Sequence, residues 1–222
     1  MAIDGILADL ASQGWSRFSN HDSDIEDVIT QLGFIILEND VLVQQHTPAL
    51  VTSSERLPPH TDHHLSHYIL WHCLVQDQRG GHSIMIDGLR VFSLMPSDVQ
   101  EILRTIHLKE HLVFKDDVGY HPLIYETPLG DRIYYSVLFE PTAFWLVNED
   151  LSIKQQEAFD TFNEAVRFAK TIQLKLKPGE CLVIDNRRML HGRTALEDNS
   201  NRLLKRYWIG AEKIEKYVEH RG

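Results

Sequence analysis

The feature that most constrains this chain is one aspartate and two histidines that stand far apart in the sequence. The tripeptide His60-Thr61-Asp62 lies in the first third of the chain, and His191 lies near its end. Alternate residues of a β-strand point to the same face, so His60 and Asp62 would share one face. Two imidazoles and one carboxylate can hold non-haem Fe(II) on one side and leave the opposite side open. The sequence therefore predicts a fold, such as a closed sheet, in which distant strands meet at one interior point.

The other histidines leave a second interpretation open. The chain has 13 histidines, so one His-x-Asp pair can arise by chance. His63 and His64 follow Asp62 directly, and this run resembles half of a zinc hydrolase motif whose first His-x-His pair is missing here. Six further histidines are expected to pack or to lie on the surface: His67, His72, His82, His107, His111 and His121. The first two of these are also candidates for lining a pocket.

The charge and hydropathy of the chain disfavour several classes of partner. A formal net charge of −10 and an isoelectric point near 5.7 argue against nucleic acid or an anionic membrane surface. No apolar run approaches the ~18 residues of a membrane-spanning helix, and no basic and apolar leader indicates a signal peptide. Cys73 and Cys181 lie in apolar runs, which predicts buried, reduced thiols. We expect a cytoplasmic protein.

Nothing in the sequence marks a domain boundary, so residues 1–222 are expected to form a single domain. Helices are predicted over 23–32, 98–106 and 153–169, with Ser23, Ser97 and Ser152 as their caps. Strands are predicted over short apolar or alternating ranges: 34–37, 41–45, 67–75, 83–87, 111–115, 132–137, 172–176, 180–184 and 202–210. Many short strands with few helices predict a mainly β fold, a double-sheet jelly roll with helices packed outside it.

Several short motifs follow one another along the chain: Pro59-His60-Thr61-Asp62, Gly80-Gly81-His82-Ser83, His121-Pro122, Pro128-Leu129-Gly130, Pro178-Gly179-Glu180, Asp185-Asn186-Arg187, Leu190-His191-Gly192-Arg193 and Arg202-Leu203-Leu204-Lys205-Arg206. In this order they resemble the Fe(II)/2-oxoglutarate-dependent dioxygenases of the taurine dioxygenase/clavaminate synthase-like superfamily, from about residue 57 to residue 210. The resemblance implies the double-stranded β-helix of that superfamily, a cupin-like barrel with a few flanking helices.

The resemblance also implies a role for individual residues. His60, Asp62 and His191 would be the iron ligands. Arg202 would bind the distal carboxylate of 2-oxoglutarate, because its planar fork suits bidentate binding of a carboxylate. Ser83 stands where the family often has a threonine that donates to the same carboxylate. Arg206 shares a strand face with Arg202 and would hold an acidic group of the substrate, the alternative being an ion pair with an internal Asp or Glu.

The function that these features predict is oxidation, chiefly hydroxylation, of a C–H bond in a small amino-acid-like or carboxylate-bearing metabolite. The reaction would use O2 and convert 2-oxoglutarate to succinate and CO2. A metal-dependent hydrolase or isomerase on a cupin-like barrel is the main alternative, and a non-catalytic binding protein is a third. The stretch between Asp62 and Gly80 is shorter than is usual in the family, which predicts a more open pocket or one completed by a second subunit of a homo-oligomer.

Overall fold

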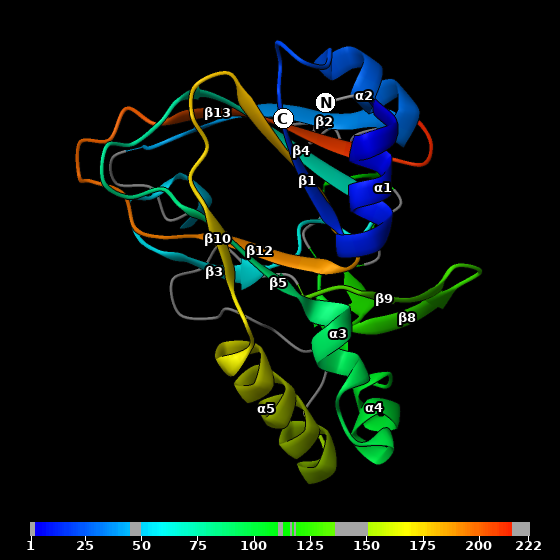
Figure 1. The fold of residues 1–222 in the computed structure, drawn as a ribbon. Coiled ribbons are helices and arrows are strands. Elements are labelled where there is room, and N and C mark those ends of the chain that lie inside the picture. The colour runs from blue at the N-terminus through cyan, green and yellow to red at the C-terminus, as the bar shows by residue number, and fades with distance from the viewer. Residues whose placement is uncertain are drawn as a thin grey trace, which may run out of the picture.

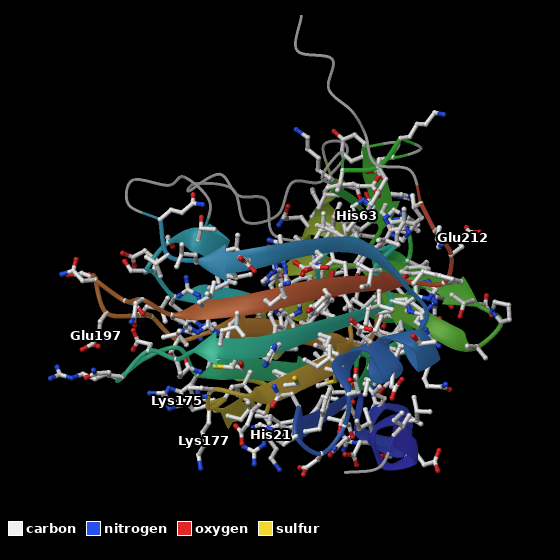
Figure 2. The ribbon with its side chains drawn as sticks, turned by 90° about the horizontal axis from the view of Figure 1, so that it is seen from above. His21, His63, Lys175, Lys177, Glu197 and Glu212 are labelled. Carbon is white, nitrogen blue, oxygen red and sulfur yellow. The ribbon has the colours of Figure 1, made fainter. Side chains whose placement is uncertain are left out.

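The computed structural model describes residues 3–44, 50–110, 113–115, 117, 119–135 and 151–214. Two antiparallel β-sheets lie face to face, with helices outside both of them (Figure 1). The larger sheet has the order β1 (Trp15–Ser19), β11 (Glu180–Asp185), β4 (Tyr68–Val75), β13 (Leu203–Gly210) and β2 (Phe34–Leu42). The smaller sheet has the order β10 (Ile172–Leu174), β5 (Ser83–Asp87), β12 (Met189–Arg193) and β3 (Leu57–His60). Each sheet therefore combines strands from both halves of the chain. The strands of the larger sheet run side by side when that sheet is seen from above (Figure 2).

The alternation of side chains along the strands decides which residues enter the space between the sheets. On β12, Met189 packs in the core between the sheets, whereas Leu190 packs in the core beneath the smaller sheet. Alternate residues share a face, so His191 points with Met189 into the space between the sheets. On β13, Leu204 and Trp208 belong to the same inner core, which places Arg206 on the inner face as well.

Helices cover the outer face of each sheet (Figure 1). Helices α1 (Ile3–Gln13) and α2 (Ile25–Leu32) pack on the larger sheet through an apolar cluster that includes Ile6, Val28 and Val183. Helices α3 (Gly88–Ser93), α4 (Ser97–Leu103) and α5 (Ile153–Phe168) pack beneath the smaller sheet. Helix α5 buries one apolar stripe, including Phe159 and Phe162, because these residues recur at helical spacing.

Two short hairpins lie between β5 and β10 of the smaller sheet, and one helical turn lies between β2 of the larger sheet and β3 of the smaller one. Strands β6 (His107–Lys109) and β7 (Tyr120–Pro122) form one hairpin, and β8 (Ile124–Thr127) and β9 (Gly130–Ile133) form the other. A 3₁₀ turn, η1 (Leu50–Thr52), precedes β3. The β6–β7 pair brings the intervening segment, which contains Glu110 and Asp117, to the turn that follows Asp62.

Most of the predicted elements are present, and the mainly β prediction is confirmed. Strand β5 has the predicted bounds, and β4, β11 and β13 differ from their predictions by one residue at one end. Helix α5 begins with the predicted capping box, in which Ser152 and Gln155 bond to each other's backbone. Cys73 and Cys181 are buried and free, as predicted. Within the described ranges, no helix has the length and apolar character needed to span a bilayer.

Several predicted boundaries were wrong for identifiable reasons. Helix α2 is capped by Asp24 rather than Ser23, because the Asp24 carboxylate accepts the backbone N–H of Glu26 at 2.7 Å. Helix α4 ends at Leu103 rather than at 106, and its cap position is Pro96, with no side-chain cap from Ser97. The predicted strands 34–37 and 41–45 form one strand, β2, at the edge of the sheet, where polar residues are tolerated; position 45 lies outside the described residues.

Other elements were not predicted at all. Helices α1 and α3 and strands β1, β3 and β12 are present without having been expected. The predicted strand over 111–115 is not a strand where it is described, since Phe114 makes only an isolated bridge and 111 and 112 lie outside the described residues. The strand predicted over 132–137 ends at Ile133, and positions 136 and 137 also lie outside them. β10 ends at Leu174, before the predicted 176.

Candidate metal centre

The antiparallel pairing of β12 with β3 brings His191 and His60 together. The two residues are direct register partners, and their ring centroids lie 4.4 Å apart. Asp62 follows two residues after His60, and its Oδ1 lies 3.6 Å from Nε2 of His60 while its Oδ2 lies 3.8 Å from Nε2 of His191. One ligand atom from each of the three residues falls within 4.8 Å of the others, and all three side chains are buried. The structure thus brings the predicted ligand set to one point between the sheets.

Gly192, directly after His191, permits the close approach of these two strands. A Cβ atom at this position would lie 2.4 Å from the carbonyl oxygen of Leu57 and 2.9 Å from the carbonyl carbon of Pro58. Both are backbone atoms, so a side chain here would push β12 away from β3. The register shift between His191 and Arg193 lies at the same place. The His-Gly pair is therefore a local requirement of the metal centre.

Backbone groups and Asn186 orient the His60–Asp62 segment. Nδ1 of His60 lies 2.9 Å from the carbonyl oxygen of Pro58, which fixes the proton on Nδ1 and leaves Nε2 with a lone pair for a metal. The Oδ1 of Asn186 accepts the backbone N–H of Asp62 at 2.8 Å, and its Nδ2 donates to the carbonyl of Ser66 at 2.8 Å. Asn186 therefore fixes the turn that carries Asp62.

Asp62 is held in its ionised form. Its Oδ2 accepts hydrogen bonds from Nη1 of Arg206 at 3.1 Å and from Nε1 of Trp208 at 2.8 Å. Burial by itself raises the pKa of Asp62, but Arg206 and the neighbouring imidazoles lower it more, so the pKa lies well below its usual range. Both hydrogen bonds fall on Oδ2, which leaves Oδ1 as the oxygen best placed to bind a metal.

The imidazole of His191 is also in the form that binds a metal ion. Burial lowers the pKa of His191 to about 3, with a further contribution from nearby His60. The ring is therefore neutral at physiological pH, as a metal ligand must be. Trp71 packs its ring against His191, with centroids 4.9 Å apart, and shields this side of the centre. Two neutral imidazoles and one carboxylate fit Fe(II) and leave coordination positions open.

A cavity between the sheets adjoins the metal centre. His60 and His191 form part of its wall, together with Ser83, Arg202 and Arg206. Most of the rest is apolar: Val41, Val51, Leu57, Trp71, Ile84, Met85, Leu182 and Leu204. All six residues predicted for the site therefore lie at this cavity or, in the case of Asp62, directly behind its wall. Small-molecule sites commonly combine such an apolar lining with a few converging polar groups.

Arg202 is a buried cation without a carboxylate partner in the described part of the chain. Its side chain is almost fully buried, and its Nε donates to Oε1 of Gln76 at 3.1 Å. Burial lowers the pKa of the guanidinium to about 10, so it remains charged at neutral pH. Gly81 leaves room for it, because a Cβ there would lie 3.1 Å from Cδ of Arg202 and 2.8 Å from Oε1 of Gln76. A buried, unpaired charge is costly, so this arrangement suits an anionic ligand.

Arg206 makes the ion pair with an internal carboxylate that stood as the alternative to substrate binding. Besides Asp62, it donates from Nε to Oδ1 of Asn39 at 3.2 Å, and its guanidinium lies 5.1 Å from the ring centre of Trp208. Its Nη2 has no hydrogen bond within the described ranges, and the residue lines the cavity. A contact with substrate is therefore compatible with this ion pair and stays a prediction.

Other residues considered from the sequence lie elsewhere. His67 and His72 are not part of the cavity wall. Among the aromatic residues, Trp71 lines the cavity, whereas Tyr135 packs against Phe162 beneath the smaller sheet. The sequence reasoning missed Trp208 and Gln76, and only the alternation along β13 could have indicated Trp208, since it shares a face with Arg206.

Arg193 has a structural role close to the centre. Its guanidinium donates to the backbone carbonyls of Leu50, Ser53 and Glu55, and so fastens the segment that leads into β3. Burial lowers the pKa of Arg193 to about 10, with a contribution from nearby Arg202. Arg193 therefore stabilises the fold next to the centre through carbonyl groups.

Comparison with known proteins gives one matching family and two relatives of similar sequence. The model of the family described as "Taurine catabolism dioxygenase TauD, TfdA family" matches residues 4–208. The mitochondrial trimethyllysine dioxygenase of Gallus gallus is 27% identical over 139 residues, which cover 57% of this chain and 33% of that protein. The enzyme of the same name from Mus musculus is 26% identical over 137 residues, covering 56% and 32%. The match thus spans about a third of the length of these relatives.

Solved structures share the fold at low sequence identity. An asparagine oxygenase, in complex with Fe(II), 3-hydroxyasparagine and succinate, matches with a TM-score of 0.72 and 16% identity, covering 95% of this chain and 78% of that one. The non-heme iron oxygenase OrfP, in complex with Fe and α-ketoglutaric acid, matches with a TM-score of 0.68 and 19% identity, again covering 95% and 78%. The two antiparallel sheets and flanking helices are therefore an arrangement that these oxygenases have in common with this chain.

Proposed function

Because the chain belongs to the taurine catabolism dioxygenase TauD, TfdA family, we propose that it is an Fe(II)- and 2-oxoglutarate-dependent oxygenase. It oxidises, chiefly by hydroxylation, a C–H bond of a small metabolite and releases succinate and CO2. The observation that carries this proposal is the position of Arg202. This buried guanidinium, with no carboxylate partner in the described ranges, opens on the cavity that also contains His60 and His191. A hydrolase or isomerase would need the metal centre but no such anion site.

The residues of the metal centre have distinct tasks. His60 and His191 supply neutral imidazole nitrogens, and Asp62 supplies the charge of Oδ1. Bound Fe(II), together with 2-oxoglutarate and O2, supplies the oxidising power that protein side chains lack. The protein orients the ligands through Pro58 and Asn186 and excludes water with the apolar wall of the cavity. Side chains held by such outer contacts keep their geometry as ligands come and go.

We assign the distal carboxylate of 2-oxoglutarate to Arg202, with Ser83 as a second donor. Ser83 lies on β5 opposite Arg193 of β12 and lines the same cavity as Arg202. The guanidinium supplies a rigid pair of N–H donors, and a charge-assisted pair of this kind is about twice as strong as a neutral hydrogen bond. Binding of the dianion would compensate the positive charge that is buried at Arg202.

The substrate is proposed to be an amino acid or a related carboxylate-bearing metabolite, with Arg206 holding its acidic group. Nη2 of Arg206 supports this role, because Nη1 already donates to Asp62 and Nε already donates to Asn39. The structural relatives add support: one contains 3-hydroxyasparagine, and OrfP has been solved with a hydroxylated arginine. The matched dioxygenases of Gallus gallus and Mus musculus are named for trimethyllysine, another amino acid.

The proposal also covers the architecture of the two sheets and the number of domains. The strand orders β1-β11-β4-β13-β2 and β10-β5-β12-β3 support a double-stranded β-helix, the jelly roll predicted from the sequence. The family match over residues 4–208 supports a single domain. A second subunit that completes the pocket remains part of the proposal.

Substrate-dependent consumption of O2 tests the function. The iron-loaded protein is given 2-oxoglutarate and a panel of amino acids and their amides, and O2 uptake, succinate and the oxidised product are measured. We expect succinate to form in step with O2 uptake, faster with one class of free acids than with the matching amides. No succinate with any compound, at full iron occupancy, would contradict the oxygenase assignment. Equal rates with acids and amides would contradict the role given to Arg206.

A further inference from the structure

A second group of histidines and carboxylates lies beside the metal centre without sharing a residue with it. His63 and His64 come from the turn after Asp62, and Glu110 and Asp117 come from the segment between β6 and β7. Figure 2 labels His63, which lies among densely packed side chains next to the green part of the chain. We call these four residues the His63 cluster.

Three members of the His63 cluster, His63, His64 and Glu110, have ligand atoms within 4.8 Å of one another, and Asp117 contacts His63. Nε2 of His63 lies 3.2 Å from Oδ1 of Asp117 and 3.4 Å from Oε1 of Glu110. Nδ1 of His64 lies 2.5 Å from the same oxygen of Glu110. Tetrahedral zinc with bonds of ~2.0–2.2 Å requires its ligand atoms to lie roughly 3.3–3.6 Å apart. The two separations from His63 are close to that range, and a small shift of His64 would complete the set.

The atoms that face one another in the cluster contact only each other. Nε2 of His63, Nδ1 of His64, Oε1 of Glu110 and Oδ1 of Asp117 are all closed off from solvent, and within the described ranges their polar contacts are the ion pairs of the cluster itself. The side chains of His63, Glu110 and Asp117 are at most 1% exposed. Buried polar groups need partners, and the convergence of His63, His64 and Glu110 within 4.8 Å is one that a metal ion would satisfy.

The other oxygen of each carboxylate is already used by the backbone. Oε2 of Glu110 accepts the N–H of Gly119 at 3.2 Å. Oδ2 of Asp117 accepts the N–H groups of Val113 and Phe114 at 2.7 and 2.6 Å. The backbone thereby turns one oxygen of each carboxylate toward the histidines. This is how protein structure commonly orients metal-binding carboxylates.

We propose that His63, His64, Glu110 and Asp117 bind a second divalent metal ion of the zinc class. Two imidazoles and two carboxylate oxygens are ligands that Zn²⁺ accepts, and four protein ligands would fill a tetrahedral site. Apolar rings enclose the position: Phe114 meets His63 edge-on at 5.0 Å, and Trp208 lies nearly parallel to it at 6.1 Å. A closed site of four protein ligands is structural rather than catalytic.

The bound ion would brace the iron centre. It would join the turn after Asp62 to the β6–β7 segment, two parts of the chain that no strand pairing connects in the described ranges. Trp208 contacts both sites, since it packs against His63 and donates to Oδ2 of Asp62. The inference does not depend on the proposed oxygenase activity, because it rests on a different set of ligands.

Metal analysis of variants tests the proposal. Glu110→Gln and His64→Gln each remove a ligand, and Gln at position 110 keeps an oxygen for Gly119. His121→Gln is the matched control, because its ring stacks on His64 at 4.0 Å while its Nδ1 lies against the carbonyl of Pro122. After reconstitution with Fe(II) and Zn²⁺, we expect wild type and His121→Gln to hold two metal ions per chain. Glu110→Gln and His64→Gln should hold one, and His191→Ala should lose iron but retain zinc.

Cobalt provides a readout that does not require the cluster variants to fold. In the His191→Ala background, where the iron centre is incomplete, added Co²⁺ should give the intense visible absorption of a tetrahedral site at one equivalent. Absence of this absorption, or a wild-type protein that never holds more than one metal ion, would overturn the proposal in favour of plain ion pairs within the cluster. A second metal ion that persists unchanged in folded Glu110→Gln and His64→Gln would overturn it as well.

Discussion

Arg206 and Asp62 form a buried ion pair, with Nη1 of the arginine 3.1 Å from Oδ2 of the carboxylate. The pair crosses from β13 of the larger sheet to the segment that follows β3 of the smaller sheet. It keeps Asp62 ionised before any metal arrives, and it leaves Oδ1 directed toward His60. Arg206, which is not a proposed ligand, therefore keeps the Asp62 carboxylate ionised and orients it within the metal centre.

Breaking this pair should destabilise the metal-free protein more than the metal-bound one. Arg206→Met keeps much of the side-chain volume but leaves Asp62 buried without its cation, and removal of one partner of a buried pair costs about 3–5 kcal/mol. Bound Fe(II) would replace part of the missing charge. We expect a large fall in the Tm of the metal-free variant and a larger Tm gain on adding Fe(II) than in wild type.

The matched control for that change is Lys205→Met, one residue earlier on the same strand. Lys205 pairs with Glu38 at 2.7 Å on the surface, where solvent screens the two charges and the pair adds little to stability. The Tm of Lys205→Met should stay near that of wild type with and without iron. Equal Tm values for metal-free Arg206→Met and Lys205→Met would show that the buried pair does not stabilise the fold.

Arg202→Lys should weaken the binding of 2-oxoglutarate. Lysine keeps the positive charge but lacks the planar fork, and loss of a charge-assisted hydrogen bond costs about 1.5–3 kcal/mol, or roughly ten- to a hundredfold in affinity. The KM for 2-oxoglutarate is the quantity to measure. Arg79→Lys, at an exposed arginine on the neighbouring turn, is the control. An unchanged KM in Arg202→Lys would move the carboxylate site elsewhere, with Arg206 the next candidate.

Gly192→Ala should disturb the metal centre through the backbone. The new Cβ would meet the carbonyl oxygen of Leu57 at 2.4 Å, so β12 and β3 must separate. We expect a loss of about 1–3 kcal/mol in the free energy of unfolding and a clear drop in bound iron. In the control Gly88→Ala, the new Cβ would meet Cγ of Leu190 at 2.9 Å and the carbonyl oxygen of Arg188 at 3.3 Å, so it crowds the core without meeting the backbone of β3. Iron binding in Gly192→Ala equal to that of Gly88→Ala would contradict this account.

The protein should lose stability in mild acid, in part through His67. Burial lowers the pKa of His67 to about 4, helped by nearby Arg187, whereas an unfolded histidine titrates near 6.5. Between these values the unfolded chain binds more protons, so the free energy of unfolding falls as pH drops from about 6.5 to about 4. Urea denaturation across this range should show a weaker pH dependence in His67→Gln than in wild type. The exposed His21, labelled in Figure 2, gives the control variant His21→Gln, which should behave like wild type.

The sequence predicted the strands that carry Ser83 and Arg206, β5 and β13, but not β3 and β12, which carry His60 and His191. Alternation placed His60 with Asp62 and Arg202 with Arg206, and the cavity contains both arginines. The partner of Arg206 could not be predicted, because the chain offers many acidic residues and only the packing of the two sheets selects Asp62. The bonds of Asn186 to the Asp62 turn likewise depend on tertiary contact.

The sequence did not predict the helices and strands whose residues are a mixture of polar and apolar types or include helix- and strand-breaking residues. Helix α1 has two fully or nearly buried residues, Ile6 and Leu10, and its stability depends on packing against the larger sheet. Strand β3 contains two consecutive prolines, which ordinarily argue against a strand. They are tolerated here because β3 is the edge of the smaller sheet. The His63 cluster was recognisable only as a run of histidines, since Glu110 and Asp117 lie far along the chain.

The central claim is that His60, Asp62 and His191 bind one Fe(II) to which 2-oxoglutarate, held by Arg202, then binds. Anaerobic titration of the protein with Fe(II) and 2-oxoglutarate measures this directly through the visible metal-to-ligand charge-transfer band. The account predicts a band that saturates at one iron per chain, is absent in His191→Ala, and requires more 2-oxoglutarate in Arg202→Lys. A wild-type protein that binds iron but gives no band with 2-oxoglutarate, or a His191→Ala variant with an undiminished band, would contradict it.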